Sequence, residues 1–157
     1  RSAHIPIHHA GEWNDEALID GVRLNVLSAN RLDSSARSLN DRSIVMRLSY
    51  GSFSVLLTGD IEQKGEAALL RSNQILQSTV LKVAHHGSNT SSRDSFIGAV
   101  HPEWAVIQCR EGGQFNFPHS EISARFQKRN IPTSVTGFVG TIQIRSDGAR
   151  WSVNRLL

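Results

Sequence analysis

The sequence lacks several features that would assign it to a class at once. Cys109 is its single cysteine, which excludes an internal disulfide and a zinc site built from several cysteines. No apolar run is long enough to cross a membrane, and the first nine residues, RSAHIPIHH, do not resemble a signal peptide. The chain also has no internal repeats and no low-complexity segment. We therefore expect a soluble chain without a membrane segment.

The charge balance is mildly basic. Seventeen Lys and Arg stand against fourteen Asp and Glu, a net charge of +3, and the isoelectric point is near 9.6. No long basic run is present, so this balance permits an anionic partner such as nucleic acid without requiring one.

The residues that are present predict a single globular domain. With 157 residues, 39% hydrophobic and 20% charged, the chain can bury one core. We expect residues 1–18 to be irregular and residues 21–28, where Val22, Leu24 and Val26 alternate with polar residues, to form a strand. Residues 29–41 are rich in Ser, Asn and Asp, which is typical of an exposed loop.

A β-hairpin is predicted next, and strand–helix units follow it. Apolar residues alternate on both sides of a tight turn at Gly51 and Ser52. The later pattern predicts helices at 61–72, 92–100 and 120–130, and strands at 79–84, 103–109, 133–136, 140–146 and 149–156. The fold class is therefore α/β, or α+β by a strict reading, with helices covering a mixed sheet.

Polar residues follow several predicted strands, at the point where each ends. Asp60 follows FSVLL, His85 and His86 follow VLKVA, and His119 lies beyond WAVIQC. Because the carboxyl ends of strands in an open α/β sheet form one edge, we expect these side chains on a common rim. Imidazole and carboxylate favour zinc, manganese or iron, and two such ions can clamp a phosphoryl group. The small polar residues after His86 suit a phosphate oxygen.

Each of these residues also has a simpler interpretation. Asp60 can be the N-cap of a helix that begins at Ile61, and His119 can only orient a helix start. The two adjacent histidines can be a surface pair or bind a backbone carbonyl. Ser88 and its neighbours are turn formers, and Cys109 can be a small buried hydrophobic residue.

Three segments in order, VLLTGD, LKVAHHGSNTSS and FPHSEI, resemble the metallo-β-lactamase superfamily. The similarity is strongest to the C-terminal hydrolase domain of ComEC-type DNA-uptake proteins and their free-standing relatives. It extends over about residues 20–150, including the segments GVRLNVLS and GTIQIRSDG.

The resemblance implies a four-layer αββα sandwich and a metal-dependent hydrolase, in this branch a nuclease. Asp60 would bridge the metal ions, and His85 and His119 would be metal ligands. His86 would contact the scissile phosphate or protonate the leaving group, although the roles of the two adjacent histidines can be reversed. Ser88, Asn89 and Thr90 would complete the phosphate site.

One family feature is absent. The leading metal motif, a histidine–x–histidine-or-aspartate–x–aspartate–histidine cluster, does not occur, and HIPIHH at 4–9 has no aspartate. The chain therefore resembles the C-terminal half of the domain, a single partial domain over 1–157. We expect the isolated chain to bind a metal weakly or not at all and to lack activity. An upstream segment or a separate chain would supply the rest of a two-ion zinc or manganese site.

The leading hypothesis is thus a metal-dependent hydrolase of nucleic-acid phosphodiesters, DNA more than RNA. The first alternative is a non-catalytic module that binds nucleic acid or a partner protein. A hydrolase of lactone, thioester or β-lactam substrates fits the phosphate-like loop less well. The resemblance implies a cytoplasmic location for a free-standing protein, and the extracytoplasmic side of the membrane for a domain of a channel.

Overall fold

The computed structural model describes residues 16–28 and 38–156. The predictions for residues 1–15, including the histidines of HIPIHH, and for most of the loop at 29–37 fall outside the described residues. All statements below concern the described part of the chain.

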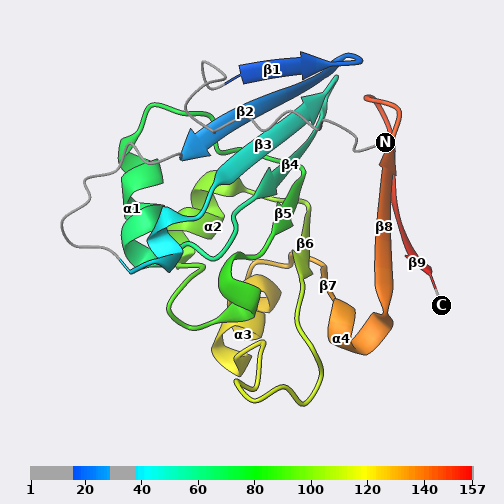
Figure 1. The fold of residues 1–157 in the computed structure, drawn as a ribbon. Coiled ribbons are helices and arrows are strands. Elements are labelled where there is room, and N and C mark those ends of the chain that lie inside the picture. Colours follow the sequence, from blue (N-terminus) through cyan, green and yellow to red (C-terminus); the bar gives the residue numbers. More distant parts are fainter. Residues whose placement is uncertain (1–15, 29–37, 157) are drawn as a thin grey trace, which may run out of the picture.

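Seven strands form one mixed sheet in which each strand pairs with its neighbour in the sequence (Figure 1). The first four strands are antiparallel, and β4 to β7 are parallel, because each of the connections β4–β5, β5–β6 and β6–β7 carries a helix. The strands are β1 (Glu16–Ile19), β2 (Val22–Ser28), β3 (Val45–Tyr50), β4 (Phe53–Leu57), β5 (Val80–Lys82), β6 (Trp104–Ile107) and β7 (Thr133–Val135).

Helices cover one face of this sheet, and a separate hairpin lies on the other face (Figure 1). The helices are α1 (Gln63–Arg71), α2 (Asp94–Val100) and α3 (Ser120–Lys128), and the hairpin is β8 (Thr141–Ser146) with β9 (Trp151–Leu156). The Trp151 ring contacts those of Phe53 and Trp104, with ring centroids 6.0 and 6.3 Å apart. The hairpin is therefore packed on the sheet through aromatic side chains.

The core lies between the sheet and the helices. Leu56 and Ile107 come from strands, while Phe96 and Phe126 come from helices, and each is at most 1% exposed. Burying a side chain of this size contributes about 1.5–3 kcal/mol to folding. This packed layer makes the strand ends a rigid base for the loops that leave them.

The α/β class is confirmed, and the predicted hairpin and the three predicted helices are present as α1, α2 and α3. The four-layer sandwich stays a prediction, since a helical layer outside β8 and β9 is not among the described residues. None of the helices in 16–28 and 38–156 has the length and apolar character of a membrane span.

Three local predictions were wrong. Residues 16–18 belong to β1, because Asp20 and Gly21, with φ of 49° and 82°, form a tight turn to β2; Asp-Gly is a strong hairpin signal. The short helix α4 (Thr136–Val139) follows β7 and was not predicted. Asp41, expected in an exposed loop, lies in the 3-10 helix η1 (Asn40–Arg42) and is 4% exposed.

Candidate functional site

The predicted rim exists at the carboxyl ends of the parallel strands. Leu57 of β4 pairs with Lys82 of β5, so the chain segments that follow the two strands leave the sheet side by side. Asp60 lies in the first segment, and the 3-10 helix η2 (Ala84–Gly87) lies in the second. An open cavity of about 900 Å³ borders both and is lined by Asp60, His85, His86, Gln108, Cys109, Arg110, Gly112, Gly113, Gln114, Phe115, Phe117 and Thr136.

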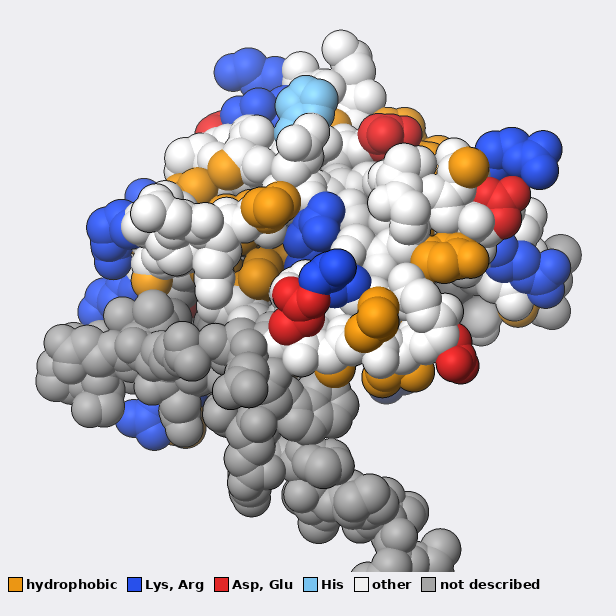
Figure 2. All heavy atoms as spheres, turned by 90° about the horizontal axis from the view of Figure 1, so that it is seen from above, with side chains coloured by type: hydrophobic (Ala, Val, Ile, Leu, Met, Phe, Trp, Pro, Cys, Tyr) orange, Lys and Arg blue, Asp and Glu red, His pale blue; other side chains and the backbone are white. Residues whose placement is uncertain are grey.

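Figure 2 looks onto the opposite, upper end of the molecule. On that face the Lys and Arg side chains are dispersed among acidic and hydrophobic ones, without one continuous basic area in the described part. Charge alone therefore does not mark that end as an interface for nucleic acid.

The two adjacent histidines have an unusual backbone. His85 and His86 have φ of 47° and 56°, and Gly87 follows with φ of 84°. The left-handed region costs a residue with a side chain about 1–2 kcal/mol. A Cβ at Gly87 would lie 2.6 Å from the Cβ of Pro118, so only glycine fits there. Strain of this kind is concentrated at functional sites, which argues against the interpretation of a simple surface pair.

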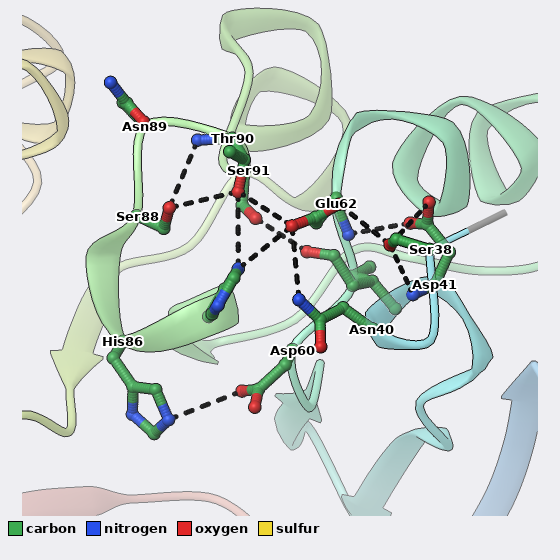
Figure 3. Close-up of polar contacts among 12 residues, drawn as sticks. Ser38, Asn40, Asp41, Asp60, Glu62, His86, Ser88, Asn89, Thr90 and Ser91 are labelled. Atoms are coloured by element: carbon green, nitrogen blue, oxygen red, sulfur yellow. Dashed lines mark hydrogen bonds and ion pairs between the residues drawn. The ribbon is translucent and has the colours of Figure 1, made fainter. Parts of the chain in front are cut away.

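Asp60 and His86 face each other across the cavity wall (Figure 3). The Nε2 of His86 lies 3.6 Å from Oδ1 of Asp60. The His86 Nδ1 lies 2.6 Å from the carbonyl oxygen of Gln108, which can only accept, so Nδ1 carries a hydrogen. In neutral His86 the Nε2 lone pair therefore points towards a carboxylate. Either a proton on Nε2 or a cation between the two groups would stabilise this arrangement.

The N-cap interpretation of Asp60 was wrong. Helix α1 begins at Gln63 with Glu62 as its N-cap residue, and the Asp60 side chain points instead to His86. The Nζ of Lys82 lies 3.9 Å from Oδ1 of Asp60 and donates to the carbonyl of Gly59 at 3.2 Å. Burial lowers the pKa of Lys82, and the Asp60 charge offsets part of that effect.

His85 turns away from Asp60 towards a second acidic group. Its Nδ1 lies 3.4 Å from Oε1 of Glu62 and 3.3 Å from Oγ1 of Thr90. Figure 3 shows Glu62 at the centre of a network that joins η1 to the loop after η2. Burial alone raises the pKa of Glu62, but hydrogen bonds from Ser38, Asn40 and Thr90, with the nearby His85 charge, lower it overall.

The remaining predicted site residues lie beside the cavity rather than in its wall. The Nδ1 of His119 accepts a hydrogen bond from the backbone N–H of Asn89 at 3.0 Å. The backbone N–H of His119 donates to the Gly87 carbonyl. Ser88 is 4% exposed, and its hydroxyl is 3.0 Å from that of Thr90. Asn89 and Thr90 are exposed. His119 therefore supports the loop after η2, and Ser88 supports it from within.

A metal ion can be accommodated only in part by these residues. Within 16–28 and 38–156, no group of three or more His, Cys, Asp and Glu side chains is placed to hold an ion. Asp60 and His86 provide two donors of suitable chemistry with a free lone pair at Nε2. This pair suits part of a ligand set, and zinc or manganese binding stays a prediction.

The pattern of the sequence did not reveal three acidic residues that organise the rim. Asp41 accepts hydrogen bonds from the N–H groups of Glu62 and Gly65, at 2.8 and 2.9 Å. Glu66 accepts from the N–H groups of Ser92 and Arg93. The sequence did contain one sign of a buried role for Glu66. This charged residue lies three positions before Leu69, on the apolar side of the predicted helix. Asp41 and Glu62 act over long sequence separations and leave no local signature.

Glu66 should make the stability of the fold depend on pH. It is 1% exposed, and burial raises its pKa to about 7, against hydrogen bonds from Arg93 and Ser92 and the charges of Arg93 and Arg125. Between its ordinary value of 4.5 and about 7, the folded state holds the proton more tightly than the unfolded state does. The free energy of unfolding should therefore fall by about 3 kcal/mol as pH rises through this range.

Urea unfolding at pH 4.5, 5.5, 6.5 and 7.5 measures this dependence. Glu66→Gln should flatten the profile between pH 4.5 and 7, whereas Glu121→Gln, at a side chain that is 58% exposed, should leave it as in the wild type. Equal slopes in wild type and Glu66→Gln would contradict the assignment.

Comparison with known proteins gives the chain its relatives. It is 32% identical to ComE operon protein 3 of Bacillus subtilis over 131 residues, which are 83% of this chain and 17% of that protein. It is 36% identical to competence protein ComA of Neisseria gonorrhoeae over 105 residues, 66% of this chain and 15% of that protein. The chain is related to competence proteins. Recombination protein 2 of Haemophilus influenzae is 31% identical over 79% of the chain and 15% of its own length.

The relation to competence proteins is limited to one segment of them. The chain spans less than a fifth of the length of each of these three relatives. No protein-family model matches the chain, so membership of the metallo-β-lactamase superfamily stays a prediction.

Proposed function

We propose that this chain forms part of the active site of a metal-dependent hydrolase that cleaves nucleic-acid phosphodiesters in a competence-type DNA-uptake protein. The observation that carries the proposal is the Asp60–His86 pair, whose side chains lie 3.6 Å apart at an open cavity, with His86 held in a left-handed backbone conformation. The names of the related competence proteins support a role in handling DNA.

The chain's own groups have distinct tasks in this proposal. His86 is oriented through Nδ1 by the Gln108 carbonyl, so its Nε2 can give a proton to the leaving oxygen of the cleaved strand. Asp60 would contribute one ligand to a zinc or manganese ion, and the other ligands would come from residues beyond the described part. Such an ion would supply an activated water and a positive charge beside the phosphate oxygens. The Lys82 ammonium, 3.9 Å from Oδ1 of Asp60, offsets part of the charge of that carboxylate.

The loop after η2 would contact the phosphate backbone in this proposal. Asn89 and Thr90 are exposed, Thr90 lies beside His85, and the hydroxyl of Ser88 contacts that of Thr90. Arg110 also lines the cavity, and its guanidinium is a group suited to a phosphate next to the cleaved one.

A chimera tests the function directly. The chain alone should cleave a fluorescent DNA oligonucleotide at the background rate with Mn²⁺ or Zn²⁺, because its described residues offer too few ligands around Asp60 to hold an ion. When this chain replaces the matched region of ComE operon protein 3, the chimera should cleave the same DNA in a metal-dependent reaction. Gel analysis over time measures both rates. Rapid cleavage by the chain alone, or none by the folded chimera, would contradict the proposal.

The second candidate is a non-catalytic module that binds nucleic acid or a partner protein. The proximity of the Lys82 ammonium to Asp60 favours it, since a cation from the protein already balances the carboxylate. This candidate predicts that the chimera binds DNA but contains no tightly bound metal by elemental analysis.

A further inference from the structure

Three aromatic rings lie nearly parallel along one side of the cavity. The ring of Phe117 stacks on that of His86, with centroids 6.2 Å apart and planes at 24°. The ring of Phe115 stacks on the other side of Phe117, at 5.5 Å and 25°. The three rings form a ladder that begins at the imidazole facing Asp60 and ends at Phe115, which is 62% exposed. We call these three residues the aromatic ladder.

The middle ring of the ladder is held from several sides. Phe117 makes edge contacts with His85 and His119, at centroid distances of 5.9 and 5.2 Å. Among the described residues the ring contact of Phe115 is the one with Phe117. Phe115 lies in the loop that joins β6 to α3, and this loop forms the lower edge of Figure 1. The Phe117 ring is therefore held in place, and the exposed Phe115 ring presents an aromatic surface to a ligand that enters the cavity.

The chemistry of the cavity selects one class of ligand. The cavity of about 900 Å³ is lined by Phe115 and Phe117, by the amide-bearing residues Gln108 and Gln114, and by Arg110. Aromatic rings bind the flat faces of nucleobases, amides bind their edges, and a guanidinium binds phosphate. In a duplex those flat faces are covered by neighbouring base pairs, so the ladder fits an unpaired base.

We infer that Phe115 and Phe117 form a stacking site for an unpaired nucleobase, which makes single-stranded nucleic acid the preferred substrate of this cavity. The inference rests on the proposed function, because it is the Asp60–His86 pair at the inner end of the ladder that would act on the adjoining phosphate. Arg110 lines the same cavity as Phe115 and would be available to the phosphate of a nucleotide whose base stacks there. Stacking does not depend on the identity of the base, so recognition is tolerant of sequence.

Binding measured by fluorescence anisotropy in EDTA tests the site without any hydrolysis. The probes are single-stranded oligothymidine, an abasic strand with the same number of phosphates, and a duplex of equal length. The wild type should bind oligothymidine at least about fivefold more tightly than the abasic strand, and also more tightly than the duplex. Phe115→Ala should remove the preference for bases, and Phe115→Trp should keep it.

Phe138→Ala is the matched control, since Phe138 is also 62% exposed but does not line the cavity. Its preference should equal that of the wild type. Circular dichroism verifies that each variant is folded. A wild type without preference for bases, or a Phe115→Ala variant that retains the full preference, would overturn the inference.

The two proposals can fail separately. If the base preference is present and is lost in Phe115→Ala while the chimera cleaves no DNA, the stacking site stands and the hydrolase proposal fails. If the chimera cleaves duplex and single-stranded DNA at equal rates, and Phe115→Ala does not change either rate, the hydrolase stands and the stacking site fails.

Discussion

Asp60→Asn should lower the rate of metal-dependent DNA cleavage by the chimera at least about hundredfold. The substitution keeps the size of the side chain but removes the negative charge that faces Nε2 of His86 at 3.6 Å. An amide is a far weaker ligand for a divalent ion than a carboxylate, and it cannot stabilise a protonated imidazole by charge. Initial rates at saturating Mn²⁺, together with the metal content of the purified protein, measure the effect.

The control for this substitution is Asp147→Asn in the β8–β9 turn. The Oδ1 of Asp147 accepts hydrogen bonds from the N–H groups of Ala149 and Arg150, which an asparagine oxygen can replace. That variant should cleave DNA at the wild-type rate. A chimera with Asp60→Asn that retains both its metal and its rate would show that Asp60 is not part of the active site.

His86→Asn should have a loss of similar size, about 10²–10⁴-fold, if His86 protonates the leaving oxygen. Asparagine tolerates the left-handed backbone of this position, so the fold should be preserved. His101→Asn, at another left-handed histidine outside the cavity wall, isolates the backbone effect and should be silent.

The rim was predictable from the sequence because its logic is topological. Residues that follow adjacent parallel strands lie at one edge of the sheet, and this rule correctly brought Asp60, His85 and His86 together. The rule did not predict that His119 lies beside the cavity and not in its wall. A loop of eleven residues, 108–118, separates His119 from the end of β6. A long loop loses the register that a strand provides.

The partners within the rim were not predictable. Two consecutive left-handed residues point their side chains to different groups, so His86 faces Asp60 and His85 faces Glu62. Sequence patterns assume ordinary backbone conformations and carry no sign of this turn. The aromatic ladder has the same origin, since stacking of Phe117 on His86 depends on the orientation that the turn gives the imidazole.

Long-range carboxylates account for the rest of what sequence could not supply. Asp41 contacts the N–H groups of Glu62 and Gly65 across 21 and 24 residues. The sequence pattern that predicts a helix at 61–72 does not extend to Asp41. The carboxylate of Asp41 therefore takes the place in which a local N-cap residue was expected. The approach is close: a Cβ at position 65 would lie 2.8 Å from Oδ1 of Asp41, so glycine is needed there.

Asp41→Ala should therefore destabilise the fold by about 3 kcal/mol or more, since two hydrogen bonds to a charged group are lost and their buried donors stay unpaired. The carboxylate also interacts favourably with the N-terminus of α1. Asp41→Asn, which keeps an acceptor oxygen, should lose less. Asp94→Ala is the matched control, because Asp94 also lies in the first turn of a helix but its side chain is 61% exposed. Urea unfolding gives each free energy, and the control should change it by less than about 1 kcal/mol.

The same substitution should reach the rim, because Asp41 fixes the backbone of Glu62, whose carboxylate lies beside His85. Without urea, where the Asp41→Ala chimera is still folded, its cleavage rate should fall. The His85 side chain should lose its fixed position in the same variant. Two-dimensional NMR of the imidazole signals reports that order, and Asp94→Ala should leave both the signals and the rate unchanged. An unperturbed His85 signal in a destabilised Asp41→Ala protein would mean that Asp41 supports only α1. Loss of both would mean that the helix cap and the rim are one unit, joined through the hydrogen-bond network around Glu62.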